Sequence, residues 1–205
     1  MNAWCWGMLA VFLLARGRMA RAEDVARRPN EADEAFVARV VGTPAEELAH
    51  PVVRSTELAG GKAALIAFVE AEEELVGHLL VERAPLRFEH VTFPSCEVEG
   101  GSAKILAVFF ARTARDRARD LGVLCEWDEH HPYADVDGAF YEARFYRVSD
   151  EANRLGVRPL PEIDKRFKTS DLERNHHGRW VRETRPAFTT VAEVKRRLSR
   201  MGIKP

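Results

Sequence analysis

The densest group of side chains that could carry chemistry lies in the segment CEWDEHHPYADVDG. Neutral imidazole nitrogen and carboxylate oxygen are the usual ligands of zinc. A second pair, His176-His177, could complete four ligands if the fold brings it close. Against a metal site, adjacent histidines on an extended segment point to opposite sides, and no H-E-x-x-H spacing occurs. The sequence favours a polar loop between two strands, with a metal-ligating role as the alternative for these residues: Asp128, Glu129, His130, His131, Asp135, Asp137, His176 and His177.

Part of this cluster has a simpler explanation as a turn. Asp135-Val136-Asp137-Gly138 precedes an aromatic-rich segment that is typical of a strand. Aspartate caps a turn locally and glycine adopts positive φ, so Asp-Gly is turn chemistry. We therefore predict a turn here.

A second charged segment, ARTARDRARD, lies between two apolar runs that we predict to be strands. Only Asp116 and Asp120 offer carboxylates, and four guanidinium groups around them would repel a divalent cation. The first expectation is a solvated turn. The alternative is a patch that grips an acidic partner through bidentate pairs, made by Arg112, Arg115, Arg117 and Arg119.

A strand, a polar loop of about ten residues and a second strand resemble the calcium-loop hairpins of FG-GAP-type propeller blades, whose loops are EF-hand-like. The pattern is also similar to uncharacterised exported bacterial proteins with a degenerate loop of this kind. The resemblance rests on Val108-Phe109-Phe110, Trp127, Gly138, Tyr141-Glu142 and, at the end of the chain, Leu198, Met201 and Gly202. It implies a calcium loop, but the arginines of this loop depart from that implication.

The first 22 residues predict export. An uncharged apolar run from Ala3 to Ala15 has the length of a secretory h-region and is too short to span a bilayer as a helix. Ala20 and Ala22 form an A-x-A cleavage pattern. No Lys or Arg precedes the run, so an uncleaved anchor or a start at Met19 stays open. We predict a signal peptide over 1–22, a single domain over 23–205, and a periplasmic or secreted protein.

Two cysteines remain after residue 22, Cys96 and Cys125, and both alternate with apolar residues. Both thiols should therefore point to the same buried side of a sheet. Because export supplies an oxidising compartment, we predict that they form a disulfide. The rival interpretation is two separate buried thiols.

The elements that must position these groups are mostly strands. We predict a helix from Glu31 that Asn30 caps and Gly42 ends, and a C-terminal helix with a Thr190–Glu193 capping box ended by Gly202. Between them, short spacing and glycine turns favour antiparallel pairing. We expect 103–111 to be a central buried strand, 121–127 to alternate, and 149–188 to be irregular. The predicted fold class is α+β: a mostly antiparallel sheet with an N-terminal helix and a C-terminal covering helix.

Charge excludes some functions. The formal net charge is −1, and it becomes −4 once the three arginines of 1–22 are removed, so a basic nucleic-acid binder is not indicated. A mildly acidic chain should be weakly repelled by anionic membranes. No G-x-S-x-G, P-loop or C-x-x-C occurs, and we expect no cofactor. The favoured function is an exported, non-enzymatic binding or structural protein of the bacterial envelope, for example an inhibitor or immunity-type partner of another exported protein. The alternative is a metal-dependent hydrolase using the 128–137 cluster, so enzymatic activity and oligomeric state stay open.

Overall fold

The computed structural model describes residues 22–72, 74–97, 103–113, 119–131, 133, 135–151 and 154–203. Except for Ala22, the predicted signal segment lies outside these residues. Arg115 and Arg117 of the charged segment lie outside them as well.

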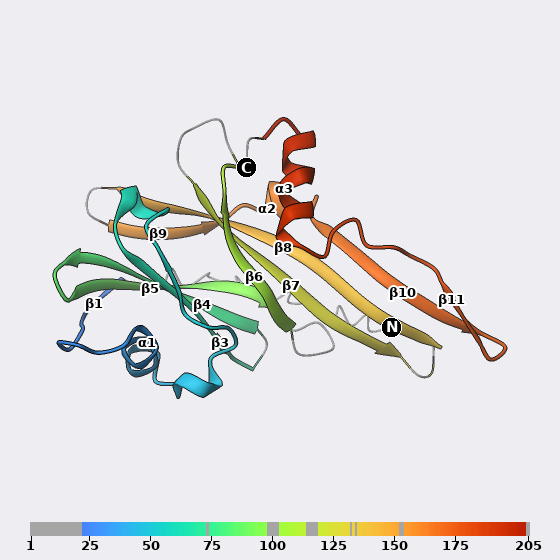
Figure 1. Ribbon diagram of the computed structural model, residues 1–205, viewed down its shortest axis with the longest axis horizontal. Coiled ribbons are helices and arrows are strands. Elements are labelled where there is room, and N and C mark those ends of the chain that lie inside the picture. Colours follow the sequence, from blue (N-terminus) through green and yellow to red (C-terminus); the bar gives the residue numbers. More distant parts are fainter. Residues whose placement is uncertain are drawn as a thin grey trace, which may run out of the picture.

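Two antiparallel sheets make up the molecule (Figure 1). The N-terminal sheet has the strand order β1-β5-β4-β3-β2. Its strands are β1 (Glu23–Ala26), β2 (Val53–Ser55), β3 (Ala64–Glu70), β4 (Glu74–Ala84) and β5 (Arg87–Glu97). The C-terminal sheet has the order β11-β10-β8-β7-β6, and β9 also pairs with β8. Its strands are β6 (Ala103–Ala111), β7 (Asp120–His131), β8 (Val136–Glu151), β9 (Arg154–Pro159), β10 (Lys168–His176) and β11 (Arg179–Arg182).

The predicted α+β class is wrong. About 55% of the described residues are in strands and 18% are helical, and the two sheets face each other as in a β-sandwich. The helical elements are short: α1 (Asp33–Val41), η1 (Ala45–Glu47), η2 (Ala59–Gly61), α2 (Pro161–Asp164) and α3 (Val191–Arg200). The error came from 149–188, which supplies the end of β8, β9, β10 and β11. Its polar strands lack the apolar alternation by which a half-buried strand is recognised.

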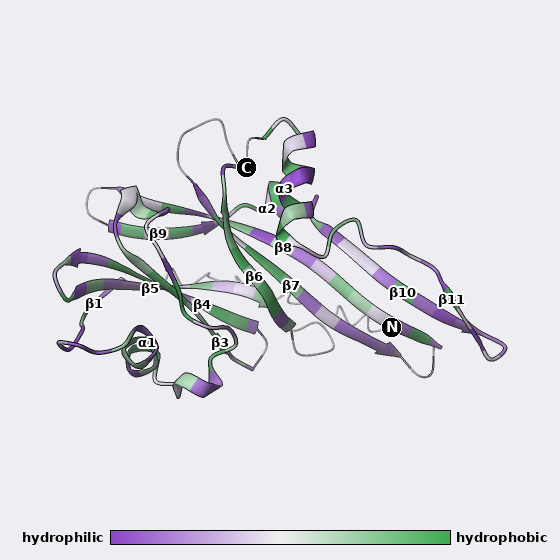
Figure 2. Ribbon diagram, viewed as in Figure 1, coloured by the Kyte–Doolittle hydropathy of each residue, from purple (hydrophilic) through white to green (hydrophobic). Residues whose placement is uncertain are grey.

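Three hydrophobic clusters hold the layers together. The largest lies between the inner faces of the two sheets and includes Phe68, Leu79, Val123 and Tyr146. A second lies under α1 on the outer face of the N-terminal sheet. The third joins α3 to the outer face of the C-terminal sheet. Each sheet therefore buries apolar side chains on both faces. In Figure 2 the strands carry green hydrophobic residues interspersed with purple hydrophilic ones.

The alternation predicted for 121–127 is confirmed. Leu121, Val123, Cys125 and Trp127 all face the cluster between the sheets. By contrast, the segment 103–111 is not the central strand that we predicted, because β6 is an edge of its sheet. It is apolar on both faces because Ile105 packs between the sheets while Phe109 packs under α3. A bulge between Ile105 and Ala107 makes this switch and leaves Leu106 exposed.

Both long helices end as predicted. Gly42 has φ 77° and ends α1, although Asn30 does not cap this helix, which begins at Asp33 after Ala32. The capping box of α3 is present: the Thr190 hydroxyl accepts from the Glu193 N–H, and the Glu193 carboxylate accepts from the Thr190 N–H. Gly202 follows the helix with φ 76°. These caps satisfy backbone groups that helix ends leave unpaired.

A glycine lies beneath an aromatic ring in each sheet. Gly77 of β4 is opposite Phe93 of β5, and Gly122 of β7 is opposite Phe109 of β6. A Cβ atom on either glycine would overlap the facing ring. Both glycines are therefore required by close approach rather than by backbone conformation.

An ionic network connects the two sheets near the end of β4 and the end of β8. Arg83 of β4 donates to Glu89 at 2.6 Å and to Asp150 of β8 at 2.6 Å, and Lys62 donates to Asp150 at 2.7 Å. Hydrogen bonds from Arg83 and Lys62 lower the pKa of Asp150 to about 2. The Leu155 N–H also donates to Glu89. Strand ends of both sheets are therefore fixed relative to each other.

A pair of histidines is buried on the outer face of the N-terminal sheet. His78 Nδ1 and His90 Nε2 lie 3.0 Å apart, and the rings stack with centroids 5.2 Å apart. Burial and the neighbouring His90 lower the pKa of His78 to about 4. Burial also lowers the pKa of His90. The pair is therefore neutral at physiological pH.

Candidate functional site: a groove on the uncovered sheet face

The C-terminal sheet is longer than its partner. Its strands β7, β8, β10 and β11 run to the right of Figure 1, beyond the N-terminal sheet. There no layer of the described part of the chain covers the inner face. Side chains of the register pairs Trp127–Phe140 and Phe140–Ser170 share this face because alternate residues of each strand point to one side.

A groove of about 390 Å³ lies on this face. Phe140 is 42% exposed, whereas Trp127 is buried beside it. The groove is lined by Trp127, Glu129, Phe140, Tyr141, Glu142, Arg144, Lys168, Thr169 and Ser170. A volume of this size is within the range of small-molecule sites, which combine an apolar floor with a few polar groups.

The polar wall of the groove is an ordered row of charges. Glu142 is only 7% exposed. Its carboxylate lies 3.3 Å from Arg144 Nη2 and 3.4 Å from Lys168 Nζ. Arg144 also donates from Nη1 to the Ser95 carbonyl at 2.6 Å. With Glu129, the lining residues carry two carboxylates and two cations, so the groove offers hydrogen-bond donors and acceptors without a net formal charge.

Asp164 of α2 lies next to β8, beside the residues that line the groove. Its Oδ1 accepts from the Phe145 N–H at 2.8 Å, where neither β9 nor β10 pairs with β8. Burial raises the pKa of Asp164 to about 6, and the Glu142 charge adds to the rise. The carboxylate therefore replaces a strand partner at a gap in the sheet, at a cost in desolvation.

The cysteine pair anchors the inner end of the groove. Cys96 of β5 and Cys125 of β7 lie at disulfide distance, with Cα atoms 6.5 Å apart, and both are fully buried. This geometry is the one predicted from the sequence. Cys96 follows Ser95, the acceptor of Arg144, and Cys125 is two residues before Trp127. The covalent link thus fixes the groove's floor and wall to the N-terminal sheet.

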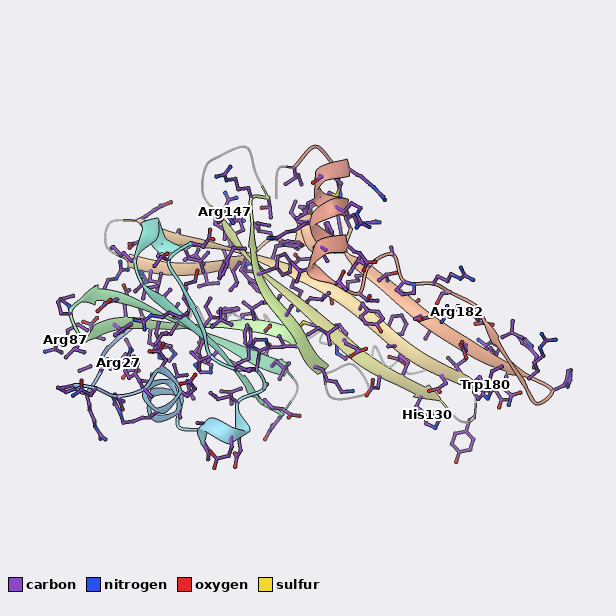
Figure 3. All side chains as sticks on the ribbon, in the orientation of Figure 1. Arg27, Arg87, His130, Arg147, Trp180 and Arg182 are labelled. Atoms are coloured by element: carbon purple, nitrogen blue, oxygen red, sulfur yellow. A yellow bond between two sulfur atoms is a disulfide. The ribbon has the colours of Figure 1, made fainter. Side chains whose placement is uncertain are left out.

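The predicted metal cluster is divided between two faces. Asp128, His130 and Asp137 share the outer face, whereas Glu129 lies on the inner face and lines the groove. His130 Nδ1 lies 3.3 Å from Asp137 Oδ1, and Asp128 pairs with Lys104 at 2.5 Å. Figure 3 places His130 at the far end of the sheet.

The remaining members of that cluster lie elsewhere. Asp135 is in the turn before β8 with φ 53°, and His176 and His177 are exposed at the β10–β11 turn. His131 ends β7, and its side chain lies outside the described residues. Within the part of the chain that the structure describes, no three His, Cys, Asp or Glu side chains are grouped to hold a metal ion.

The predicted Asp-Gly turn is displaced. The residue with turn conformation is Asp135, and Gly138 lies inside β8 with φ 149°. A Cβ atom at Gly138 would overlap the Asp171 carbonyl of β10. Gly138 is therefore needed for close strand approach rather than for the turn itself.

The charged segment contributes structure at both of its described ends. Asp120 is fully buried and accepts from the Thr113 N–H and hydroxyl, and Arg147 Nε lies 2.7 Å from Asp120 Oδ1. Arg119 pairs with Glu57 at 2.8 Å, and Arg112 is exposed. Asp120, which the sequence analysis considered as a carboxylate for a cation, therefore links the two ends of the 113–120 segment and pairs with Arg147.

Of the lining residues, the sequence analysis singled out only Glu129 as a candidate ligand-binding residue. It missed Trp127, Phe140, Tyr141, Glu142, Arg144, Lys168, Thr169 and Ser170. A signal was present, because Phe140, Glu142 and Arg144 alternate along one strand face. What the sequence could not show is that the opposing sheet ends before this face does. In chemical terms, the described lining combines an aromatic floor with paired charges, so it can contact a ligand both by stacking and by hydrogen bonds.

No family model, curated protein or solved structure matches this chain. None of the described helices is long and apolar enough to cross a membrane.

Proposed function

We propose that this chain is an exported, non-enzymatic binding protein of the bacterial envelope, and that the groove holds its ligand. The observation that carries the proposal is the groove on the inner face of the C-terminal sheet, beyond the described N-terminal sheet, with Phe140 exposed on its floor. Export is supported by the sequence of residues 1–22 and by the Cys96–Cys125 pair, since disulfides persist in oxidising compartments.

The chemistry of the lining favours a ligand with one apolar flat side and a hydrogen-bonding edge. The face of an aromatic ring is electron-rich and attracts polarised C–H groups. Glu129 and Glu142 accept hydrogen bonds, Arg144 and Lys168 donate them, and Ser170 does both. A sugar ring has this combination of C–H faces and hydroxyl edges, so we infer that the ligand contains a saccharide unit.

Calorimetric titration with neutral hexose and N-acetylhexosamine oligomers tests the proposal. We expect at least one oligomer to bind and to be recovered uncleaved. Phe140→Ala should weaken that binding at least tenfold. The matched control is Leu106→Ala, because Leu106 is 40% exposed on the edge strand β6 and does not line the groove.

Two outcomes would contradict the proposal. In the first, no oligomer binds, or the two variants lose affinity equally. In the second, an oligomer is cleaved and added zinc raises the rate, which would support the alternative of a metal-dependent hydrolase.

A further inference from the structure

The charge of the molecule is unevenly distributed along the chain. Residues 185–205 contain six basic residues and one acidic residue, a formal charge of +5. Because residues 23–205 together carry −4, residues 23–184 carry −9. The weak repulsion from anionic surfaces expected from net charge therefore does not describe the C-terminal end.

Four of these six basic residues, Lys195, Arg196, Arg197 and Arg200, lie on α3. The helix buries Val194 and Leu198 and turns its basic side chains away from the core. Arg197 donates to the Arg166 carbonyl at 3.0 Å, which places Arg166 beside the helix. We call the resulting surface the α3 basic patch: Arg166, Lys195, Arg196, Arg197 and Arg200.

Among the residues that the structure describes, no acidic side chain forms an ion pair with any of the five side chains of the patch, although Glu162 interacts electrostatically with Arg166. By contrast, Lys104 of β6, Arg119 before β7 and Lys168 of β10 each form an ion pair. Glu193, the acid of α3, is occupied in the capping box. Arg196 and Arg200 are exposed and lie four positions apart, a like-charge spacing that weakens a helix. The arrangement is internally unfavourable, so an external anion would relieve it.

We propose that the α3 basic patch docks the protein on an anionic phospholipid surface. Clustered Lys and Arg side chains are attracted to negatively charged headgroups without any specific pocket. A protein partner fits less well, because protein interfaces are centred on apolar or aromatic side chains. The exposed large apolar residues of the described chain lie on other elements. A single-stranded nucleic acid also fits less well, since it requires exposed aromatic rings for stacking.

The helix presents its charges rigidly. The capping box fixes its first turn, and Arg197 lies over the buried Phe167 ring with its guanidinium carbon 5.7 Å from the ring centre. Arg196 and Arg200 are exposed, so replacing them removes charge without disturbing the core. This makes them the residues of choice for a test.

Co-sedimentation with vesicles provides that test. The purified protein is mixed with vesicles of 30% phosphatidylglycerol in phosphatidylcholine, or of phosphatidylcholine alone. We expect binding only to the anionic vesicles, falling steeply as salt increases. Arg196→Glu combined with Arg200→Glu should weaken binding at least tenfold.

The control carries the same charge change elsewhere. Arg87 and Arg154 are exposed, form no ion pair with a described acid, and lie away from α3; Figure 3 shows Arg87 at the left end of the molecule. Arg87→Glu with Arg154→Glu should change binding less than twofold. Equal losses in both variants, equal binding to neutral vesicles, or binding to a single-stranded oligonucleotide or acidic peptide but not to vesicles would overturn the proposal.

Discussion

Replacing Asp164 with asparagine should stabilise the protein at neutral pH. Burial raises the pKa of this carboxyl from 3.8 to about 6, so at pH 7 the ionised carboxylate has a higher free energy in the folded state than in the unfolded state. A shift of about two pKa units corresponds to roughly 3 kcal/mol as an upper limit. The asparagine oxygen can still accept from the Phe145 N–H, but its amide N–H groups need new partners. We therefore expect a net gain of about 1–2 kcal/mol.

The pH dependence identifies the cause. Because the folded pKa is raised, the folded state of the natural protein binds more protons than the unfolded state between pH 6 and pH 4. Its stability at this residue therefore increases as the pH falls through that window, and asparagine has no such titration. The advantage of Asp164→Asn should shrink as the pH falls from 7 to 4.

Urea denaturation at pH 7, 5.5 and 4 measures this effect. Glu162→Gln on the same short helix is the control, since Glu162 is exposed and the hydrogen bond from Lys165 lowers its pKa. Its variant should show no gain at pH 7. The reasoning is refuted if Asp164→Asn is less stable than the natural protein at pH 7, or if its advantage does not depend on pH.

Three further predictions concern the core. Reduction of the Cys96–Cys125 bond should lower the melting temperature, because the bond closes a loop of about thirty residues and restricts the unfolded chain by roughly 3–4 kcal/mol; unchanged melting under a reductant would show that the thiols are free. Gly122→Ala should destabilise the fold by about 1–3 kcal/mol, because its Cβ overlaps the Phe109 ring, and the cost should fall in a Phe109→Ala background; equal costs in chemical denaturation would contradict this. Burial lowers the pKa of His78 from 6.5 to about 4, so protonation of this residue favours the unfolded state, and the free energy of unfolding should fall by up to about 3 kcal/mol as the pH decreases from 6.5 towards 4. In His78→Gln, denaturation curves should show a smaller decrease in the free energy of unfolding over this pH range; an equally steep decrease would show that His78 is not its cause.

The parts of the fold that sequence predicted are those governed by local rules. Helix capping at Thr190 and Glu193 requires only neighbouring residues, and the alternation of Leu121 to Trp127 records one buried face. The cysteine pairing followed from the same alternation. These features do not depend on how distant segments meet.

The errors came from tertiary context. The polar strand β10 is held by its pairing with β8, and its sequence alone gives no apolar period. The segment 103–111 is apolar on both faces because α3 covers one of them, although its strand lies at an edge. A sequence-based analysis could not distinguish a strand covered by a helix from a strand between two others.

The candidate site was missed for a related reason. The 128–137 segment is rich in His, Asp and Glu, but consecutive residues of a strand point to opposite faces. Only Glu129 of that segment lines the groove. The groove exists because one sheet is longer than the other. Relative sheet length depends on the pairing of the whole chain, which local patterns do not determine.

The most direct test of a ligand-binding groove is to map a bound saccharide by amide chemical shifts. The protein is labelled with ¹⁵N and titrated with the oligomer that binds most tightly in calorimetry. We expect the largest shifts on the backbone amides of Trp127, Phe140 and Ser170 and on the side-chain indole N–H of Trp127. Shifts confined to the outer face around His130, or to the exposed Trp180 of β11, would contradict this expectation.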